Sequence, residues 1–145
     1  MSIFKDQLTF VREFEAVVHE AMRTVLETSG LELKSLIVDK QLYIDGERGD
    51  GKRLEGYART TIKIKLRKQQ PVDRTTLHDS EEFANSIIID AFADSFEISS
   101  GVSYDKYIIK RYGEEVLHPS QESMEKFMNR YYLPILKSLT TSKLN

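Results

Sequence analysis

The sequence predicts an α+β protein, with a small, mostly antiparallel sheet packed by a long N-terminal helix and a C-terminal helix. Two observations lead to this fold class. The first and last parts of the chain repeat apolar residues at close to 3.6-residue spacing, the period of an amphipathic helix. The middle of the chain instead contains short alternating or β-branched runs, separated by glycine and proline, which are typical of strands and turns.

The length of 145 residues suits a single domain over residues 1–145. Cysteine is absent, which excludes disulfides, thiolate metal sites and a cysteine nucleophile. No apolar run approaches the ~18 residues of a membrane span. Asp6 also stands where a signal peptide would be apolar. We therefore expect a protein that is made in the cytoplasm and has no membrane partner.

The N-terminal helix is expected over residues 3–28, from a candidate N-cap at Ser2 to a candidate stop at Gly30. Its apolar stripe comprises Phe4, Leu8, Val11, Phe14, Val18, Met22 and Val25. Residues 35–44, with the sequence SLIVDKQLYI, are predicted to form a strand or two short ones. A glycine-rich loop follows over residues 45–56, because its glycines favour positive φ.

A basic strand is predicted over residues 60–67, whose sequence TTIKIKLR alternates apolar and basic side chains. A short helix is expected over residues 79–85, with Asp79 or Ser80 as its N-cap and Phe83 in the core. An antiparallel hairpin should occupy residues 86–100, with its turn near Ala93 and Asp94.

Two terminal helices complete the predicted fold. The first covers residues 104–112 and is stopped by Gly113. The second covers residues 120–139 and is capped by Ser120. Pro134 should kink or restart this last helix, since proline removes a donor and clashes one turn back.

The motifs that hint at catalysis are incomplete. Residues 46–52 match Gly-x4-Gly-Lys, but Arg53 stands where a phosphate-binding loop needs Ser or Thr, and no helix is expected to follow. His78, Asp79 and Ser80 are adjacent, so in an extended segment they point in alternate directions and cannot converge as a triad. His19 and His118 have no metal-binding spacing. We therefore predict a non-enzymatic protein with no catalytic residue, cofactor or metal.

Charge is segregated along the chain, although 21 basic and 23 acidic residues leave a net charge of only −2. Residues 52–74 hold eight basic and two acidic residues, a local net charge of +6, whereas residues 79–97 hold six acids and no base. A solvated strand face would explain the basic strip. A surface that faces nucleic acid or an acidic neighbour would explain it equally well, and the opposite signs suit head-to-tail contact between copies. The candidate interface or DNA-facing residues are Arg59, Lys63, Lys65, Arg67 and Lys68.

Three stretches of the chain carry a resemblance to a known class of proteins. They are residues 56–63, residues 77–86 and residues 112–117. The matching positions are Leu77, Asp79, Ser80, Phe83, Ser86, Tyr112, Gly113 and Leu117. This pattern resembles the tail-completion, or virion-morphogenesis, proteins encoded in the head–tail gene clusters of tailed phages. Glu81 stands where those proteins usually carry glycine, and His118 follows Leu117 where glycine is common.

The resemblance implies a structural ring subunit of the neck or upper tail, a head–tail connector component located in the virion after assembly in the host cytoplasm. Its implied partners are the portal, adaptor and tail-tube proteins, further copies of itself, and genome DNA passing through the channel. The alternative is a cytoplasmic nucleic-acid-binding module that uses the basic strip 52–74. Against it, only Tyr57 is aromatic in that strip, whereas single-strand binders place several aromatics among their basic residues.

Overall fold

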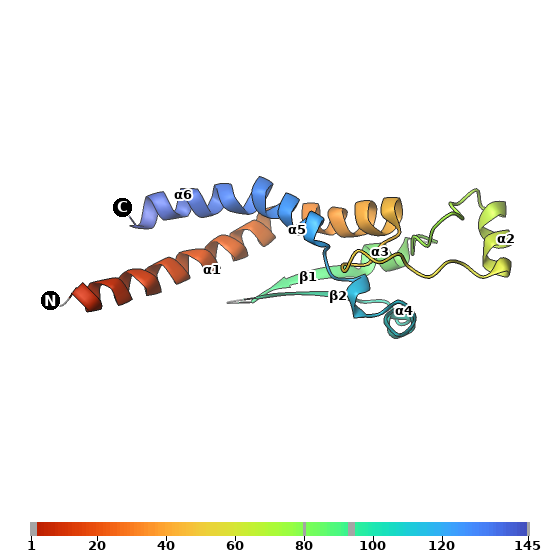
Figure 1. Cartoon of the computed structure of the whole chain (residues 1–145), viewed down its shortest axis with the longest axis horizontal. Helices are drawn as coiled ribbons and strands as arrows, with labels where there is room; N and C mark the ends of the chain where they lie inside the picture. Colours follow the sequence, from red (N-terminus) through yellow and green to blue (C-terminus); the bar gives the residue numbers. More distant parts are fainter. Residues whose placement is uncertain (1–2, 80, 93–94, 145) are drawn as a thin grey trace.

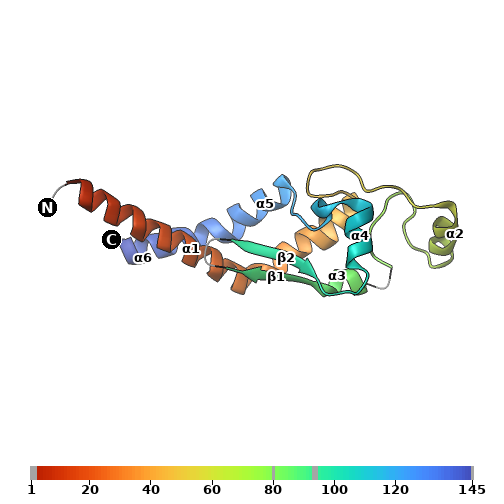
Figure 2. The same ribbon diagram turned by 90° about the horizontal axis from the view of Figure 1, so that it is seen from below.

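The computed structural model describes residues 3–79, 81–92 and 95–144, with side chains from residue 7 onward. The candidate caps Ser2 and Ser80 and the predicted turn at Ala93 and Asp94 lie outside the described residues. The molecule is elongated: the two termini lie at one end, and helix α2 (Arg59–Arg67) lies at the other (Figure 1). A helical layer and a two-stranded sheet lie between these ends (Figure 2).

The N-terminal helix α1 (Ile3–Ser35) is longer than predicted and continues directly into a π-helical segment, η1 (Leu36–Asp45). Gly30 does not end it, but α1 is kinked at Ser29 (φ −131°, ψ 18°), directly after residue 28, where the predicted helix ends. The strand predicted over residues 35–44 is therefore wrong. The apolar residues of this segment continue a helical spacing that begins at Leu33. Leu33, Ile37 and Leu42 are therefore buried on one side of the helix. Gly46, with φ +63°, is the residue that ends it.

The C-terminal helical run begins where predicted. The Ser120 side chain accepts a hydrogen bond from the Ser123 N–H (3.1 Å), which caps α5 (Gln121–Phe127). A π-helical segment, η3 (Met128–Tyr132), and α6 (Leu133–Leu144) follow without a break, so the run extends beyond residue 139. The sequence predicts an irregularity at Pro134, and the helix is irregular just before it. The Leu133 N–H donates to the Met128 carbonyl, five residues back, as in a π-helix.

The sheet is the predicted hairpin, and it confirms the α+β class. Strand β1 (Ile87–Ala91) pairs antiparallel with β2 (Phe96–Ser100), with Ile89 opposite Ile98 and Asp90 opposite Glu97. One face of β1 packs against α1 and buries Ile87. Because side chains alternate along a strand, Ile88 and Asp90 point away from the core.

The remaining short elements connect this sheet to the helices. Helix α3 (Glu82–Ser86) precedes β1, and α4 (Asp105–Tyr112) follows β2 and ends at Gly113, as predicted. A single 3₁₀ turn, η2 (Glu114–Val116), leads to α5. Among the described residues no side chain caps α3, so the prediction of Asp79 as its N-cap is wrong; Asp79 pairs with Lys68 instead.

The core lies between the helical layer and the hairpin. Its largest fully buried side chains include Leu33, Ile37, Leu42, Val116 and Phe127. Phe83 of α3 also belongs to this core, with 4% of its surface exposed, while Leu77 packs at its edge. The buried core residues come from α1, η1, α3, β1, η2, α5 and η3 and from the segments between them, but none comes from α2, which is consequently held by its own local contacts.

Candidate functional site

The predicted basic strand over residues 60–67 is wrong, because these residues form helix α2. Alternation favours a strand only where a neighbouring strand can pair with it and bury its apolar side. In the described chain the hairpin strands pair only with each other, and Ile64 and Leu66 remain 50% and 58% exposed. Helix α2 stands at the end of the molecule on two connections, residues 46–58 and 68–81 (Figure 1).

Three of the five candidate residues share the exposed face of α2. Arg59, Lys63 and Arg67 are spaced four residues apart, so they project from the same side of the helix. All three are exposed, and none has a hydrogen bond or ion pair with any residue that the structure describes. This row of three cations is the basic face of α2.

Lys65, another of the five candidates, is buried and is not part of the basic face of α2. Only 5% of it is exposed; its Nζ donates to Gln70 Oε1 (3.2 Å) and lies 4.7 Å from the centroid of the Tyr57 ring. The Tyr57 hydroxyl in turn accepts a hydrogen bond from the Thr76 N–H (2.9 Å). Lys65 therefore attaches α2 to the connection that follows it rather than facing a partner.

Lys68, the fifth candidate, is exposed but already paired. Its Nζ donates to Asp79 Oδ1 over 2.8 Å, and the Gln70 side chain donates to the Asp79 carbonyl. The hydrogen bond from Lys68 lowers the pKa of Asp79 below its ordinary value, although partial burial opposes this effect. The basic and acidic stretches of the sequence thus meet within one chain at the ion pair between Lys68 and Asp79.

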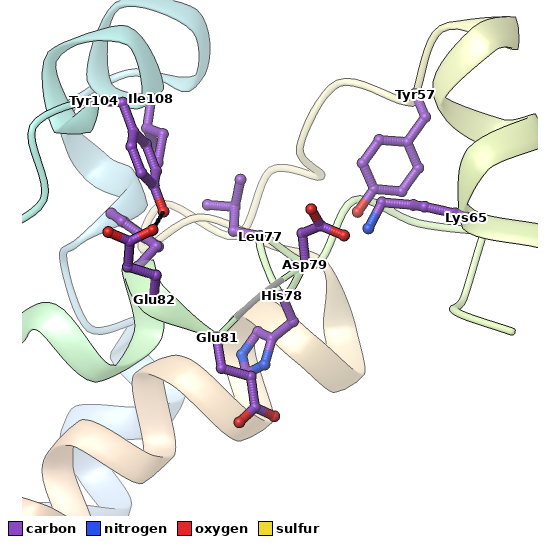
Figure 3. Close-up of a pocket in the computed structure, with 10 residues that line it drawn as sticks. Tyr57, Lys65, Leu77, His78, Asp79, Glu81, Glu82, Tyr104 and Ile108 are labelled. Atoms are coloured by element: carbon purple, nitrogen blue, oxygen red, sulfur yellow. Dashed lines mark hydrogen bonds between the residues drawn. The ribbon is translucent and has the colours of Figure 1, made fainter. Parts of the chain in front are cut away.

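A cavity of about 380 Å³ lies between α2, the segment before α3, and α4 (Figure 3). Leu77, Phe83 and Ile108 provide its apolar lining, while Asp79, Glu81 and Glu82 provide an acidic rim. The Tyr104 hydroxyl donates to Glu82 Oε2 over 3.4 Å, as the dashed line in Figure 3 marks. Among the described lining residues, Lys65 is the one lysine or arginine, and its Nζ already donates to Gln70.

Two neighbouring residues that line this cavity, His78 and Asp79, each have a partner elsewhere. His78 Nε2 lies 3.2 Å from the Val38 carbonyl oxygen, to which it can only donate, and its ring packs 4.9 Å from that of Tyr43. His78 is therefore not paired with Asp79, whose carboxylate is taken by Lys68. Within residues 3–79, 81–92 and 95–144, no three histidine, aspartate or glutamate side chains come together as metal ligands.

The glycine-rich loop packs against the chain around residue 115. An antiparallel bridge between Glu47 and Arg53 closes it, and Arg48 pairs with Asp50. This pairing lowers the pKa of Asp50, chiefly through the hydrogen bond from Arg48. The Gly49 N–H donates to the Glu115 carbonyl (2.8 Å), so this amide is not free to hold a phosphate. A Cβ at Gly49 would lie 2.5 Å from the His118 carbonyl oxygen, which explains the glycine there.

The N-terminal part of α1 presents an apolar surface that the sequence did not predict to be exposed. Leu8, Phe10, Val11 and Phe14 are 41–58% exposed, although they continue the stripe that buries Val17 and Val25. The Phe10 and Phe14 rings stack on each other at 6.3 Å. Figure 2 shows this part of α1 extending beyond α6. The periodicity of the sequence predicts the apolar stripe of α1. It does not predict where α6, which packs against α1, comes to an end.

No protein-family model, curated protein or solved structure matches this chain. Among the helices of the described residues, none is both long and apolar enough to cross a membrane.

Proposed function

We propose that this protein is a non-enzymatic ring subunit of a phage neck or upper tail. It would join portal and adaptor proteins to the tail around the DNA channel, and it would act through contacts with copies of itself and with neighbouring virion proteins. The proposal starts from the resemblance of residues 56–118 to tail-completion proteins. One observation in the structure supports it most directly, and it concerns Glu81.

Glu81 stands where the resembling proteins usually have glycine. Its backbone has φ +63°, in the left-handed region where a non-glycine side chain is strained and glycine is not. The turn into α3 therefore has the conformation that a glycine in the family pattern would require. If the similarity around Leu77 and Phe83 were a coincidence, there would be no reason for Glu81, which replaces the usual glycine, to have a positive φ.

The distribution of surface features also supports an assembly role. The ends of the molecule carry an uncovered apolar helix face and an unpaired basic helix face, while the core lies between them. Such surfaces cost solubility in a free monomer and are typical of proteins that associate.

The test is genetic and microscopic. Deletion of the gene from the phage that carries it should give DNA-packaged heads and separate tails that do not join, and a plasmid copy should restore joined particles. Electron microscopy of particles carrying a tagged copy should place the tag at the neck or upper tail. Normal infectious particles from the deletion strain would exclude this function.

The alternative, a nucleic-acid-binding module, has one observation in its favour: the basic face of α2 is exposed on a helix. Against stacking on bases, the Tyr57 ring lies beneath Lys65 and its hydroxyl is bonded to Thr76. Three phosphate contacts would give a salt slope of about −2.7 in log K against log salt concentration for duplex DNA. Fluorescence anisotropy with labelled duplex at several salt concentrations measures this slope, and tight binding by the monomer at physiological salt would favour the alternative.

A further inference from the structure

The outer face of the β1–β2 hairpin has an unusual cross-strand pair. Asp90 and Glu97 lie directly opposite each other, and both are exposed. Like charges at directly opposed positions destabilise a sheet. Neither carboxylate has an ion pair or hydrogen bond with a residue that the structure describes. Two exposed apolar side chains flank them, Ile88 at 50% and Phe92 at 52%. These four residues form the acidic face of the hairpin.

The basic face of α2 has the complementary composition. Arg59, Lys63 and Arg67 are like charges at four-residue spacing, which destabilises an isolated helix. Exposed Ile64 and Leu66 flank them, as Ile88 and Phe92 flank the two acids. Each face therefore combines unpaired charges of one sign with two exposed apolar side chains, and the two signs are opposite.

We propose that the basic face of α2 in one copy docks on the acidic face of the hairpin in the next copy. The two faces of one chain do not meet: α2 lies at the end of the molecule away from the hairpin, in both views (Figures 1 and 2). The contact is therefore between copies and heterologous, so it forms a closed ring or an open filament according to the rotation between neighbours. This inference rests on the self-association in the proposed function and names the surfaces that carry it.

The dimensions of the two faces agree. A helix of nine residues such as α2 is about 13 Å long, and a strand of five residues such as β1 about 17 Å. The helix can thus lie on the hairpin with its three cations near the two carboxylates. Pairing would remove the repulsion within both faces at once, and the flanking apolar side chains would exclude water from the charges.

Charge exchange between the faces tests the proposal. Wild-type protein at high concentration and low ionic strength should sediment as a mixture of oligomers that dissociates in high salt. D90K/E97K should remain monomeric, because both of its faces are then positive, and K63E/R67E should remain monomeric because both are negative. An equimolar mixture of the two variants should associate again, since each face then meets one of opposite charge.

Matched controls carry the same charge changes elsewhere. K106E/K110E reverses two exposed lysines spaced four residues apart on α4, and E13K/E27K reverses two exposed acids of α1; both should associate as wild type does. Circular dichroism should show that all variants are folded, because every changed side chain is exposed. Association by both reversal variants alone, or a mixture that stays monomeric, would overturn the proposal.

Cysteine cross-linking gives a second readout that does not depend on affinity. The chain has no cysteine, so K63C/E97C introduces one on each face. Mild oxidation should give a ladder of disulfide-linked oligomers, whereas K63C or E97C alone can give no more than dimers. No ladder from a folded double variant, with wild type monomeric throughout, refutes the docking. Wild-type oligomers that ignore charge reversal refute the docking but leave the ring-subunit function standing. If charge exchange restores association but the deletion strain gives normal particles, the docking stands and the ring-subunit function is refuted.

Discussion

Gln41 is a buried polar side chain that joins the N-terminal helical run to the C-terminal one. Only 2% of it is exposed. Its Nε2 donates to the His118 carbonyl (2.8 Å), and its Oε1 accepts from the Ser120 N–H (2.7 Å). Replacing it with leucine keeps the approximate volume but leaves both backbone groups without their partner. A buried group left unsatisfied costs about 1–3 kcal/mol.

Gln41→Leu should therefore lower the free energy of unfolding by about 2–4 kcal/mol, because two backbone groups lose their partner. Water can reach the carbonyl of exposed His118 and reduces part of this cost. This is a large part of the 5–15 kcal/mol of a typical domain. Urea unfolding followed by circular dichroism measures it. Gln121→Leu is the control, because Gln121 is exposed and bonds only the exposed Glu125; it should change stability by no more than about 0.5 kcal/mol. Equal unfolding midpoints for the two variants would refute the reasoning.

Three further predictions concern the segment from Leu77 to Phe83. Phe83→Ala should cost about 3–5 kcal/mol because it opens a cavity in the core, whereas His78→Ala, at a half-buried site with one hydrogen bond, should cost only about 1 kcal/mol; thermal melts that reverse this order would contradict the packing. Glu81→Gly should raise the free energy of unfolding by about 0.5–1 kcal/mol, since relief of the left-handed strain exceeds the entropy cost of glycine, and Glu81→Ala should not. The Lys68–Asp79 pair lowers the pKa of Asp79 in the folded state, so its stabilisation is present above the unfolded value of about 3.9 and is lost as the pH falls through the lower folded value. Asp79→Asn should flatten the decline in stability between pH 5 and 2, and only slightly, because both partners are about half exposed.

The elements predicted correctly have local causes that can be read in a few residues. Ser120 caps its helix with its own hydroxyl, Gly113 ends α4 with φ +90°, and the hairpin has a run of three isoleucines in β1 and Phe96 and Ile98 in β2. The apolar stripe of α1 also has the expected period. Each of these signals lies within one helix or one hairpin, so the rest of the fold is not needed to recognise it.

The two wrong strands depended on the rest of the fold. The isoleucine–valine run at Ile37 and Val38 suggests a strand locally, but the same residues continue the helical spacing that begins at Leu33. Residues 60–67 alternate as a strand does, yet in the described chain the hairpin strands pair only with each other and residues 60–67 join no sheet. Four of the five candidate site residues are exposed as predicted. Lys65 is not, because its burial comes from Tyr57 and Gln70, and the contacts of Tyr57 depend on a loop of irregular path.

The paired charges elsewhere on the molecule make the unpaired ones informative. Lys40 pairs with Asp45, Lys126 with Glu122, and Lys143 of α6 with Glu20 of α1. The basic face of α2 and the acidic face of the hairpin instead hold like charges side by side, at a cost to the isolated fold. Salt screens that repulsion, and it also screens attraction between the faces of two copies. Rising ionic strength should therefore stabilise the folded monomer slightly while dissociating its oligomers. These opposite responses separate an interface made by the two charged faces from one made by the apolar end of α1, whose association salt would not weaken.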